Sequence, residues 1–511
     1  MTVKDQRLQN AWNFIQWGLL LFPLLPLVGA VVLLWAQFVI WRKQYRQIFR
    51  SRLNWVLALF SGWLIVMSLF AYHRQDAWLG LFNFIPFFGL FATFRVLLQT
   101  PAQLRRLAQI LVLTSVPVVI MGFGQLYWGW ATPKAWHDLF LAIGCAIAPQ
   151  GNPPGRMTSI FMYTNVLAAY LAIAFILSLG LWIDSLSGVG SRESRVGRKR
   201  QGEQGRQGRL KGLKAAIANY QLPITNYQLP IVLGLVVVVN LAALILTNSR
   251  NAWAIAVIAA TAFAVYCGWR WLVVGVGAIV AVVFGAAFAP PPLHSWLRLI
   301  VPAYFWQRLT DQLYVRPEAT LRTTQWRFAW NLTQQRPWTG WGLRNFQPLY
   351  LAQTQTWMGH PHNLFLMLTA EIGIPATIVF CAWIGWILFQ SIQLLAQNPD
   401  SGKGGFNRTI KGFLINIVNK PAPTNYTLSC TGTQPCFPTD SLLPTPYSPL
   451  PHQSDRLIFF TYLVAVCACL LFNTVDVTIF DARLNTLFWI LLAAIAGVSD
   501  RQHTPAVGKS E

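Results

Sequence analysis

The chain has 511 residues, of which 55% are hydrophobic and only 11% are charged. Soluble domains carry about 25% charged residues, and the 24 Trp and 33 Phe add apolar bulk that a single soluble core could not bury. The composition therefore excludes a soluble enzyme and indicates an integral membrane protein. The formal net charge of +23 is explained first by basic loops that stay on the cytoplasmic side of a membrane, so no nucleic-acid partner is expected.

Twelve apolar segments of about the length that crosses a bilayer as a helix follow one another along the chain. The first two share one long run, Ala11 to Trp41, which Pro23 and Pro26 interrupt, so we interpret it as a tight pair of short helices; a single span is the alternative. The other ten are Asn54 to Tyr72, Ala77 to Leu98, Leu107 to Trp128, Ile160 to Ile183, Ile231 to Thr247, Ala252 to Gly268, Trp271 to Ala289, Ile372 to Leu395, Leu457 to Asn473 and Leu484 to Val498. The predicted fold class is an all-α polytopic membrane protein of about 12 transmembrane helices, with a large external loop between the ninth and tenth.

The basic residues orient these spans. With both termini in the cytoplasm, the inside loops hold 27 of the 39 Lys and Arg residues and the outside loops hold 12, of which eleven are Arg. This split agrees with the positive-inside rule. We therefore expect a multi-pass protein of the cytoplasmic membrane, with both termini cytoplasmic and its active face external.

Six regions follow from this layout, and two of them are polar inserts that are expected to be cytoplasmic. The first insert is basic and repeats the hexapeptide Asn-Tyr-Gln-Leu-Pro-Ile, and the second is rich in Pro, Ser, Thr and Asn. In chain order the regions are N-terminal helices (1–150), one further span (151–183), the basic insert (184–230), a core with its external loop at 290–361 (231–396), the second insert (397–456), and C-terminal helices with a tail (457–511).

The external loop carries seven Arg residues, opposed only by Asp311 and Glu318. The positive-inside rule disfavours such a concentration on the outer face, so the simplest explanation is an anionic ligand, because the planar guanidinium binds two phosphate oxygens at once. A solvated loop that contacts lipid headgroups is the alternative. Arg250 lies on a short turn at the outer membrane edge, where an Arg normally has a partner unless it snorkels to headgroups.

Two histidines, His360 and His362, lie where the external loop enters the next span. A histidine can act as a general base near neutral pH. Glu371 follows His362 by nine residues, about half a turn out of phase on a straight helix, so these two side chains are not expected to touch. His360 is followed by Pro361 and is expected to point elsewhere. No Asp-x-Asp motif occurs and the loop acids are sparse, so neither a metal nor a cofactor is expected.

Several ordered motifs follow one another between residues 150 and 375. They are Gly155-Arg156 with Tyr163-Thr164-Asn165, Thr247-Asn248-Ser249-Arg250, Leu-Arg-Thr-Thr-Gln-Trp-Arg-Phe-Ala-Trp-Asn from 321, Arg-Pro-Trp-Thr-Gly-Trp-Gly-Leu-Arg-Asn-Phe from 336, His-Asn-Leu-Phe-Leu from 362 and Ala-Glu-Ile-Gly from 370. In this order they resemble the O-antigen ligase and O-antigen polymerase family of bacterial envelope proteins. The chain departs from the family pattern in its two inserts and at Thr164, where a Pro often precedes the Asn.

The resemblance implies a membrane glycosyltransferase of cell-envelope polysaccharide or lipopolysaccharide assembly. Such an enzyme moves a glycan from an undecaprenyl diphosphate carrier to a hydroxyl of a glycan or lipid-linked acceptor, among membrane lipids. It implies that Arg250 and Arg322 hold the diphosphate in place of a divalent metal, and that His362 is catalytic and acts on the acceptor hydroxyl. The further candidates for substrate binding are Arg156, Asn165, Asn363 and Glu371; a helix cap or a structural hydrogen bond is the alternative role for each.

Two other functions stay open. A bicarbonate or inorganic-carbon transport protein that shares the same domain is the main alternative, because twelve spans with both ends inside is also a carrier architecture. Transport predicts charged groups near mid-membrane, whereas these spans are nearly free of charge. A non-catalytic scaffold is the third possibility. The residues do not separate a ligase from a polymerase, because both use a carrier-linked donor.

Overall fold

The computed structural model describes residues 3–200, 228–310, 317–397, 450 and 452–500. Within these ranges the chain forms helices and no β-strand. The described residues contain eleven candidate spans that are long and apolar enough to cross a membrane, one of them formed by α4 and α5 together, which confirms an all-α polytopic membrane protein. They are α2 (Pro26–Arg50), α3 (Arg52–Leu69), α4 with α5 (Arg74–Leu81 and Ile85–Leu97), α6 (Pro101–Tyr127), α8 (Thr164–Arg200), α10 (Gln228–Leu246), α11 (Arg250–Cys267), α12 (Arg270–Phe288), α18 (Ile374–Ala396), α20 (Gln453–Asn473) and α21 (Ala482–Asp500).

The long N-terminal apolar run forms two helices that pack against each other, α1 (Val3–Leu21) and α2, as expected from the prolines between them. By length and hydropathy α1 is not among the eleven candidate spans. Its first turns carry Lys4, Asp5 and Arg7, so its apolar part is shorter than a membrane-crossing helix requires. The count is therefore eleven plus α1, where the sequence predicted about twelve.

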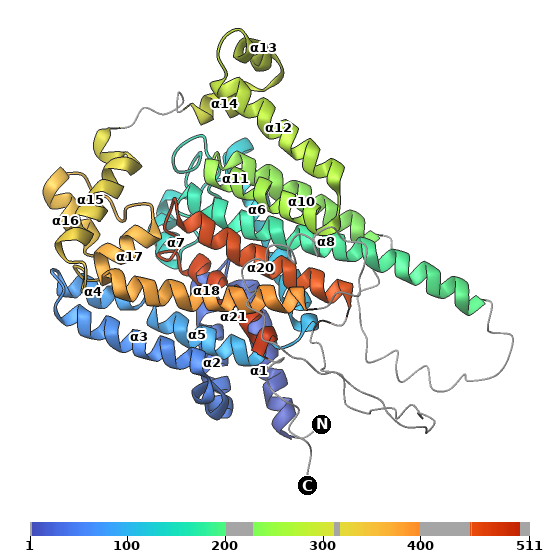
Figure 1. Ribbon diagram of the computed structural model, residues 1–511, viewed down its shortest axis with the longest axis horizontal. Coiled ribbons are helices and arrows are strands. Elements are labelled where there is room, and N and C mark those ends of the chain that lie inside the picture. Colours follow the sequence, from blue (N-terminus) through green and yellow to red (C-terminus); the bar gives the residue numbers. More distant parts are fainter. Residues whose placement is uncertain (1–2, 201–227, 311–316, 398–449, 451, 501–511) are drawn as a thin grey trace, which may run out of the picture.

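Three helices form the enclosed centre of the bundle: α8, α20 and α21 are the most buried of the candidate spans, whereas α12 is the least buried. Helix α8 packs against α6, α10, α11 and α20. Small residues allow close approach between membrane helices, and Gly497 of α21 lies so near α5 that a Cβ there would collide with the carbonyl oxygen of Leu98. At the periphery, α12 diverges from the bundle (Figure 1).

The long segment between α12 and α18 folds into short helices. They are α13 (Leu293–Ile300), α14 (Ala303–Leu309), η2 (Glu318–Thr320), α15 (Arg322–Gln335), α16 (Phe346–Thr354) and α17 (Leu364–Ile372). Helices α15 to α17 share a small apolar core of Ala329, Leu332, Phe346, Tyr350 and Ala370. This unit lies at one end of the bundle in Figure 1, and the last turns of α8 lie at the opposite end. Two further short helices, η1 (Lys134–Trp136) and α7 (His137–Ile143), connect α6 to α8.

The two predicted inserts are only partly described. Helix α8 continues to Arg200, so the chain does not leave its helix at Asp184 as the drop in apolar residues suggested. Most of the hexapeptide repeat, and nearly all of the second insert with Cys430 and Cys436, lie outside the described residues.

Candidate active site

A small polar pocket of about 50 Å³ lies where several helices begin or end. Its lining residues are Arg156, Tyr163, Asn165, Ser249, Arg250, Asn251, Arg308, Thr320, Arg322 and His362. The structure therefore brings five of the predicted site residues together, from five segments of the chain. Four of the lining residues are arginines and none is a carboxylate. Such a pocket favours an anionic ligand.

Two of these arginines are anchored by the turn between α10 and α11. Arg156 donates from Nε to the carbonyl oxygen of Thr247 at 2.9 Å, and Arg308 donates from Nε to that of Asn248 at 3.0 Å. Carbonyls at the C-terminal end of a helix lack intrahelical partners and carry partial negative charge, so they suit buried cations. Both arginines are buried, with 4% of the surface of Arg156 and 3% of that of Arg308 exposed. The left-handed backbone of Asn248, with φ of 54°, completes the turn.

The other two arginines each begin a helix. Arg250 is the first residue of α11 and Arg322 is the first residue of α15, and Arg250 also donates to the carbonyl of Leu309 at 3.4 Å. The N-terminus of a helix presents unpaired backbone N–H groups and the positive end of its dipole. Neither helix has an acidic residue in its first turn. The N-termini of these helices and the guanidinium groups therefore both add positive potential to the pocket. This combination favours the binding of phosphate.

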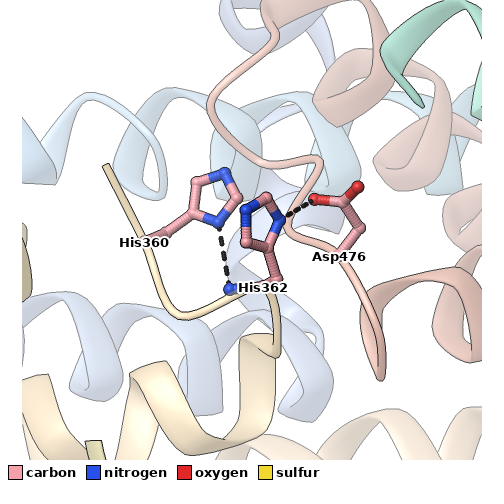
Figure 2. Close-up of side chains that lie close together, drawn as sticks. All are labelled: His360, His362 and Asp476. Carbon is pink, nitrogen blue, oxygen red and sulfur yellow. Dashed lines mark hydrogen bonds and ion pairs between the residues drawn. The ribbon is translucent and has the colours of Figure 1, made fainter. Parts of the chain in front are cut away.

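A histidine and a buried carboxylate form the second element of the site. His362 Nδ1 lies 2.9 Å from Oδ1 of Asp476 (Figure 2), and Asn165 donates from Nδ2 to the other carboxylate oxygen at 2.6 Å. The backbone N–H of Val477 donates to Oδ1 as well. Asp476 lies in the connection between α20 and α21, with 6% of its side chain exposed. The site thus joins the C-terminal helix pair to the segment that precedes α17.

The charge state of Asp476 follows from these contacts. Burial alone raises the pKa of Asp476, but the hydrogen bond from His362 and the electrostatic interactions with His362, His360 and Arg322 outweigh burial and hold this pKa well below its usual range. Asp476 is therefore ionised at neutral pH. An ionised carboxylate beside Nδ1 places the proton of a neutral imidazole on Nδ1 and leaves Nε2 as the acceptor.

The sequence predicted that His360 points away from the site, and the structure shows that this prediction is wrong. Its Nδ1 accepts a hydrogen bond from the backbone N–H of His362 at 3.2 Å (Figure 2), and its ring stacks on Phe480. Burial first, and then the charges of His362 and Arg322, lower the pKa of His360 to about 4. It therefore stays neutral at physiological pH, as the acceptor role of its Nδ1 requires. The backbone of His362 is left-handed, with φ of 51°, and the two imidazole rings lie with their centroids 4.5 Å apart.

The structure places the last two predicted site residues away from the pocket. Asn363 caps α17, because its Oδ1 accepts from the backbone N–H of Leu366 at 3.0 Å. Glu371 is 2% exposed and accepts from the backbone N–H of Phe346 at 3.4 Å. Burial raises the pKa of Glu371 to about 8 despite the backbone N–H groups of Arg344 and Phe346. Both residues thus stabilise the α15 to α17 unit. Glu371 does not meet His362, as predicted, although His362 precedes α17 and the helical spacing does not apply to it.

Two residues of the site did not emerge from the sequence. Arg308 was one of seven arginines in the external loop with no mark to distinguish it, and its place depends on how α14 folds back to the α10–α11 turn. Asp476 lies outside the motif region altogether. One signal was available, because an acidic residue between the last two spans falls on the same predicted side of the membrane as the external loop.

His360, His362 and Asp476 also place one potential ligand atom each within 4.8 Å of one another, the one such group of three in the described ranges. His362 Nδ1 is already paired with the carboxylate and His360 Nδ1 already accepts a backbone N–H. Arg322 is close enough to lower the pKa of His360, and its positive charge opposes a bound cation. We interpret the three residues as a hydrogen-bonded group.

Residues 235–381 match the family model described as O-antigen ligase. This match confirms the resemblance carried by the motifs, and it contains Arg250, Arg308, Arg322 and His362. The other partners in the site, Arg156, Asn165 and Asp476, lie outside the matched residues. No curated protein matches the chain.

Proposed function

For a chain that contains an O-antigen ligase domain at residues 235–381, we propose transfer of a glycan from an undecaprenyl diphosphate carrier to a hydroxyl acceptor at the outer surface of the cytoplasmic membrane. The domain supports glycan transfer of the O-antigen ligase type in general, and the structure adds a pocket with a chemistry suited to it. The observation that carries the proposal is the placement of His362, paired with Asp476, on a pocket lined by four arginines.

The arginines suit the diphosphate of the donor. Arg250 and Arg322 approach from two helix N-termini, while the buried Arg156 and Arg308 are held by backbone carbonyls on the α10–α11 turn. Preorganised donors of this kind stabilise the charge that grows on a leaving group without rearranging during the reaction. The diphosphate would leave with the electron pair of the bond to the anomeric carbon, and the guanidinium groups would stabilise the charge it gains.

The pair of His362 and Asp476 suits the acceptor hydroxyl. Nε2 of His362 would take the proton from the acceptor hydroxyl while the hydroxyl oxygen forms the new bond to the anomeric carbon. The imidazolium formed in this step would lie against the ionised Asp476, which also holds the ring in orientation. His360 is a positioning residue in this scheme, because it contacts the backbone of His362 and is not part of the pocket lining.

The location of the pocket favours a surface reaction over transport. All five segments that supply its charged and histidine side chains are helix ends or connections, such as the start of α11 and the segment before α17. A transport path would need polar groups near the middle of the spans. The first insert follows α8, which ends at the opposite end of the bundle from α15 to α17 (Figure 1).

The direct test is transfer by the purified chain. The protein in detergent would be mixed with a lipid diphosphate-linked glycan and, in separate reactions, with a lipid-linked acceptor or a second donor glycan. Product with the first acceptor identifies a ligase and product with the second a polymerase. If neither reaction gives product, while proteoliposomes of the same protein accumulate labelled bicarbonate, the transfer proposal is wrong and transport takes its place.

A further inference from the structure

A second cavity lies far from the polar pocket along the chain and has the opposite character. It measures about 330 Å³, is lined almost entirely by apolar surface, and lies between α2, α3 and α5. Trp41 and Phe49 of α2, Trp55 and Ala58 of α3, and Phe88 and Gly89 of α5 are among its lining residues. We call it the α2–α3–α5 groove.

The polar atoms beside this groove already have partners. Trp41 Nε1 donates to Oγ1 of Thr93 at 2.8 Å, and Trp55 Nε1 donates to the carbonyl of Phe49 at 2.7 Å. The hydroxyl of Ser61 donates within its own helix to Leu57. The groove therefore offers few hydrogen bonds to a guest and suits a hydrocarbon chain. All three helices belong to candidate spans, so the natural source of such a chain at this depth is the membrane itself.

The end of the groove next to the α2–α3 turn is strongly basic. Arg50 is the last residue of α2 and Arg52 the first of α3, and both are exposed with no ion-pair partner in the described part of the chain. Arg42 and Arg46 are exposed on the last turns of α2. The sequence has no acidic residue between Asp5 and Asp76. Nearby Arg95 differs, because Asp500 pairs with it.

We propose that the α2–α3–α5 groove binds one anionic phospholipid, with an acyl chain between Trp41, Trp55 and Phe88 and its headgroup at the α2–α3 turn. Apolar surface favours any lipid chain in proportion to the area it buries, so the groove alone would not select a headgroup. The exposed arginines supply the selection, since a basic residue near the bilayer surface attracts anionic headgroups. Arg52 lies at the start of α3, where backbone N–H groups lack intrahelical partners.

This proposal goes beyond glycan transfer and is tested without an activity assay. The full chain, purified in detergent, would be mixed with equal amounts of phosphatidylglycerol and phosphatidylcholine and examined by native mass spectrometry. We expect one phosphatidylglycerol molecule to remain bound as the detergent is stripped away. Complete loss of lipid, or equal retention of both lipids, would overturn the proposal.

Two pairs of variants assign the binding to this groove. Ala58→Trp fills the groove from an exposed position, and Leu59→Trp places the same bulk on its neighbour, which is 72% exposed and does not line the groove. Lipid retention should fall on the order of tenfold in the first variant and stay unchanged in the second. Equal retention by both, at equal melting temperature, would show that the lipid binds elsewhere.

The second pair tests the headgroup. Arg52→Gln and Arg74→Gln each remove one exposed Arg from the first position of a helix, α3 and α4, but only Arg52 is next to the groove. The preference for phosphatidylglycerol should fall on the order of fivefold in Arg52→Gln and persist in Arg74→Gln. An undiminished preference in Arg52→Gln would contradict the role of the α2–α3 turn.

Discussion

Asp476 lies 2.9 Å from Nδ1 of His362, although 114 positions separate the two residues along the chain. The contact exists because the connection between α20 and α21 packs against the segment that precedes α17. Asn165, at the start of α8, holds the second carboxylate oxygen. Three distant segments thus fix one imidazole, and its ring faces a pocket that four arginines line.

The first prediction concerns this carboxylate. Asp476→Asn keeps the size of the side chain and removes the charge that orients His362 and stabilises its protonated form. We expect transfer to fall on the order of 10²–10⁴-fold, with binding of the lipid diphosphate donor retained. Asp138→Asn, on the exposed face of α7, is the matched control and should keep full activity. Unchanged transfer by Asp476→Asn would remove the carboxylate from the mechanism.

The second prediction concerns the arginines. Arg→Lys keeps the positive charge and loses the planar fork that binds two oxygens, so donor binding should weaken on the order of 10- to 100-fold in Arg250→Lys, Arg308→Lys and Arg322→Lys. Arg327→Lys makes the same change at an exposed position of α15 and should bind the donor normally. Equilibrium binding of a labelled lipid diphosphate measures both. Normal binding by the first three variants would argue against a diphosphate clamp.

The third prediction is a pH dependence of stability that comes from Glu371. Burial raises its pKa from an ordinary value of 4.5 to about 8 in the folded protein. Between these values the folded state keeps a proton that the unfolded state releases, so the stabilisation is fully present below the unfolded pKa and is lost as pH rises through about 8. The apparent melting temperature should therefore decline from pH 5 to pH 8.

Glu371→Gln tests this origin, because the amide keeps an oxygen for the backbone N–H of Phe346 and does not ionise. Its melting temperature should change less over the same range and exceed that of the native protein at pH 8. A decline as steep as that of the native protein would show that another group is responsible.

The fourth prediction concerns which side of the membrane each loop faces. It rests on the 27 Lys and Arg residues in the predicted inside loops and the 12 in the outside loops. A reporter fused near Gln353, an exposed residue of α16, should report an external position, and one fused within residues 401–455 should report a cytoplasmic one. The reverse pattern would place the pocket on the cytoplasmic face and exclude the proposed reaction at the outer surface.

The helices could be predicted from sequence because apolar runs of membrane length have few alternatives to a helix. The break at Pro23 and Pro26 was predicted for the same kind of local reason. Glu371 and His362 do lie apart as predicted, but helical spacing is not the reason, because His362 precedes the start of α17 at Leu364. The helices and the break at the prolines depend on neighbours in the chain or on a periodicity of a few residues.

The site was predictable only in part. Ordered motifs selected Arg156, Arg250, Arg322 and His362, which the structure gathers around one pocket. Asp476 was missed because its role depends on packing between segments that no local pattern connects. The prediction for His360 was wrong because the left-handed backbone of His362, which no local pattern indicated, accompanies a hydrogen bond from its N–H to the ring of His360. Asn363 was selected as a site residue, although its local position before α17 makes it a helix cap.

The central claim is that His362 acts on the acceptor while the arginines hold the donor, and His362→Ala measures it most directly. Glycan transfer and donor binding would be determined on the same purified preparation, with a melting curve to show that the variant is folded. The proposed mechanism predicts that transfer falls on the order of 10²–10⁴-fold while the affinity for the lipid diphosphate donor stays within the range of the native protein. Native rates of transfer by folded His362→Ala would contradict the claim.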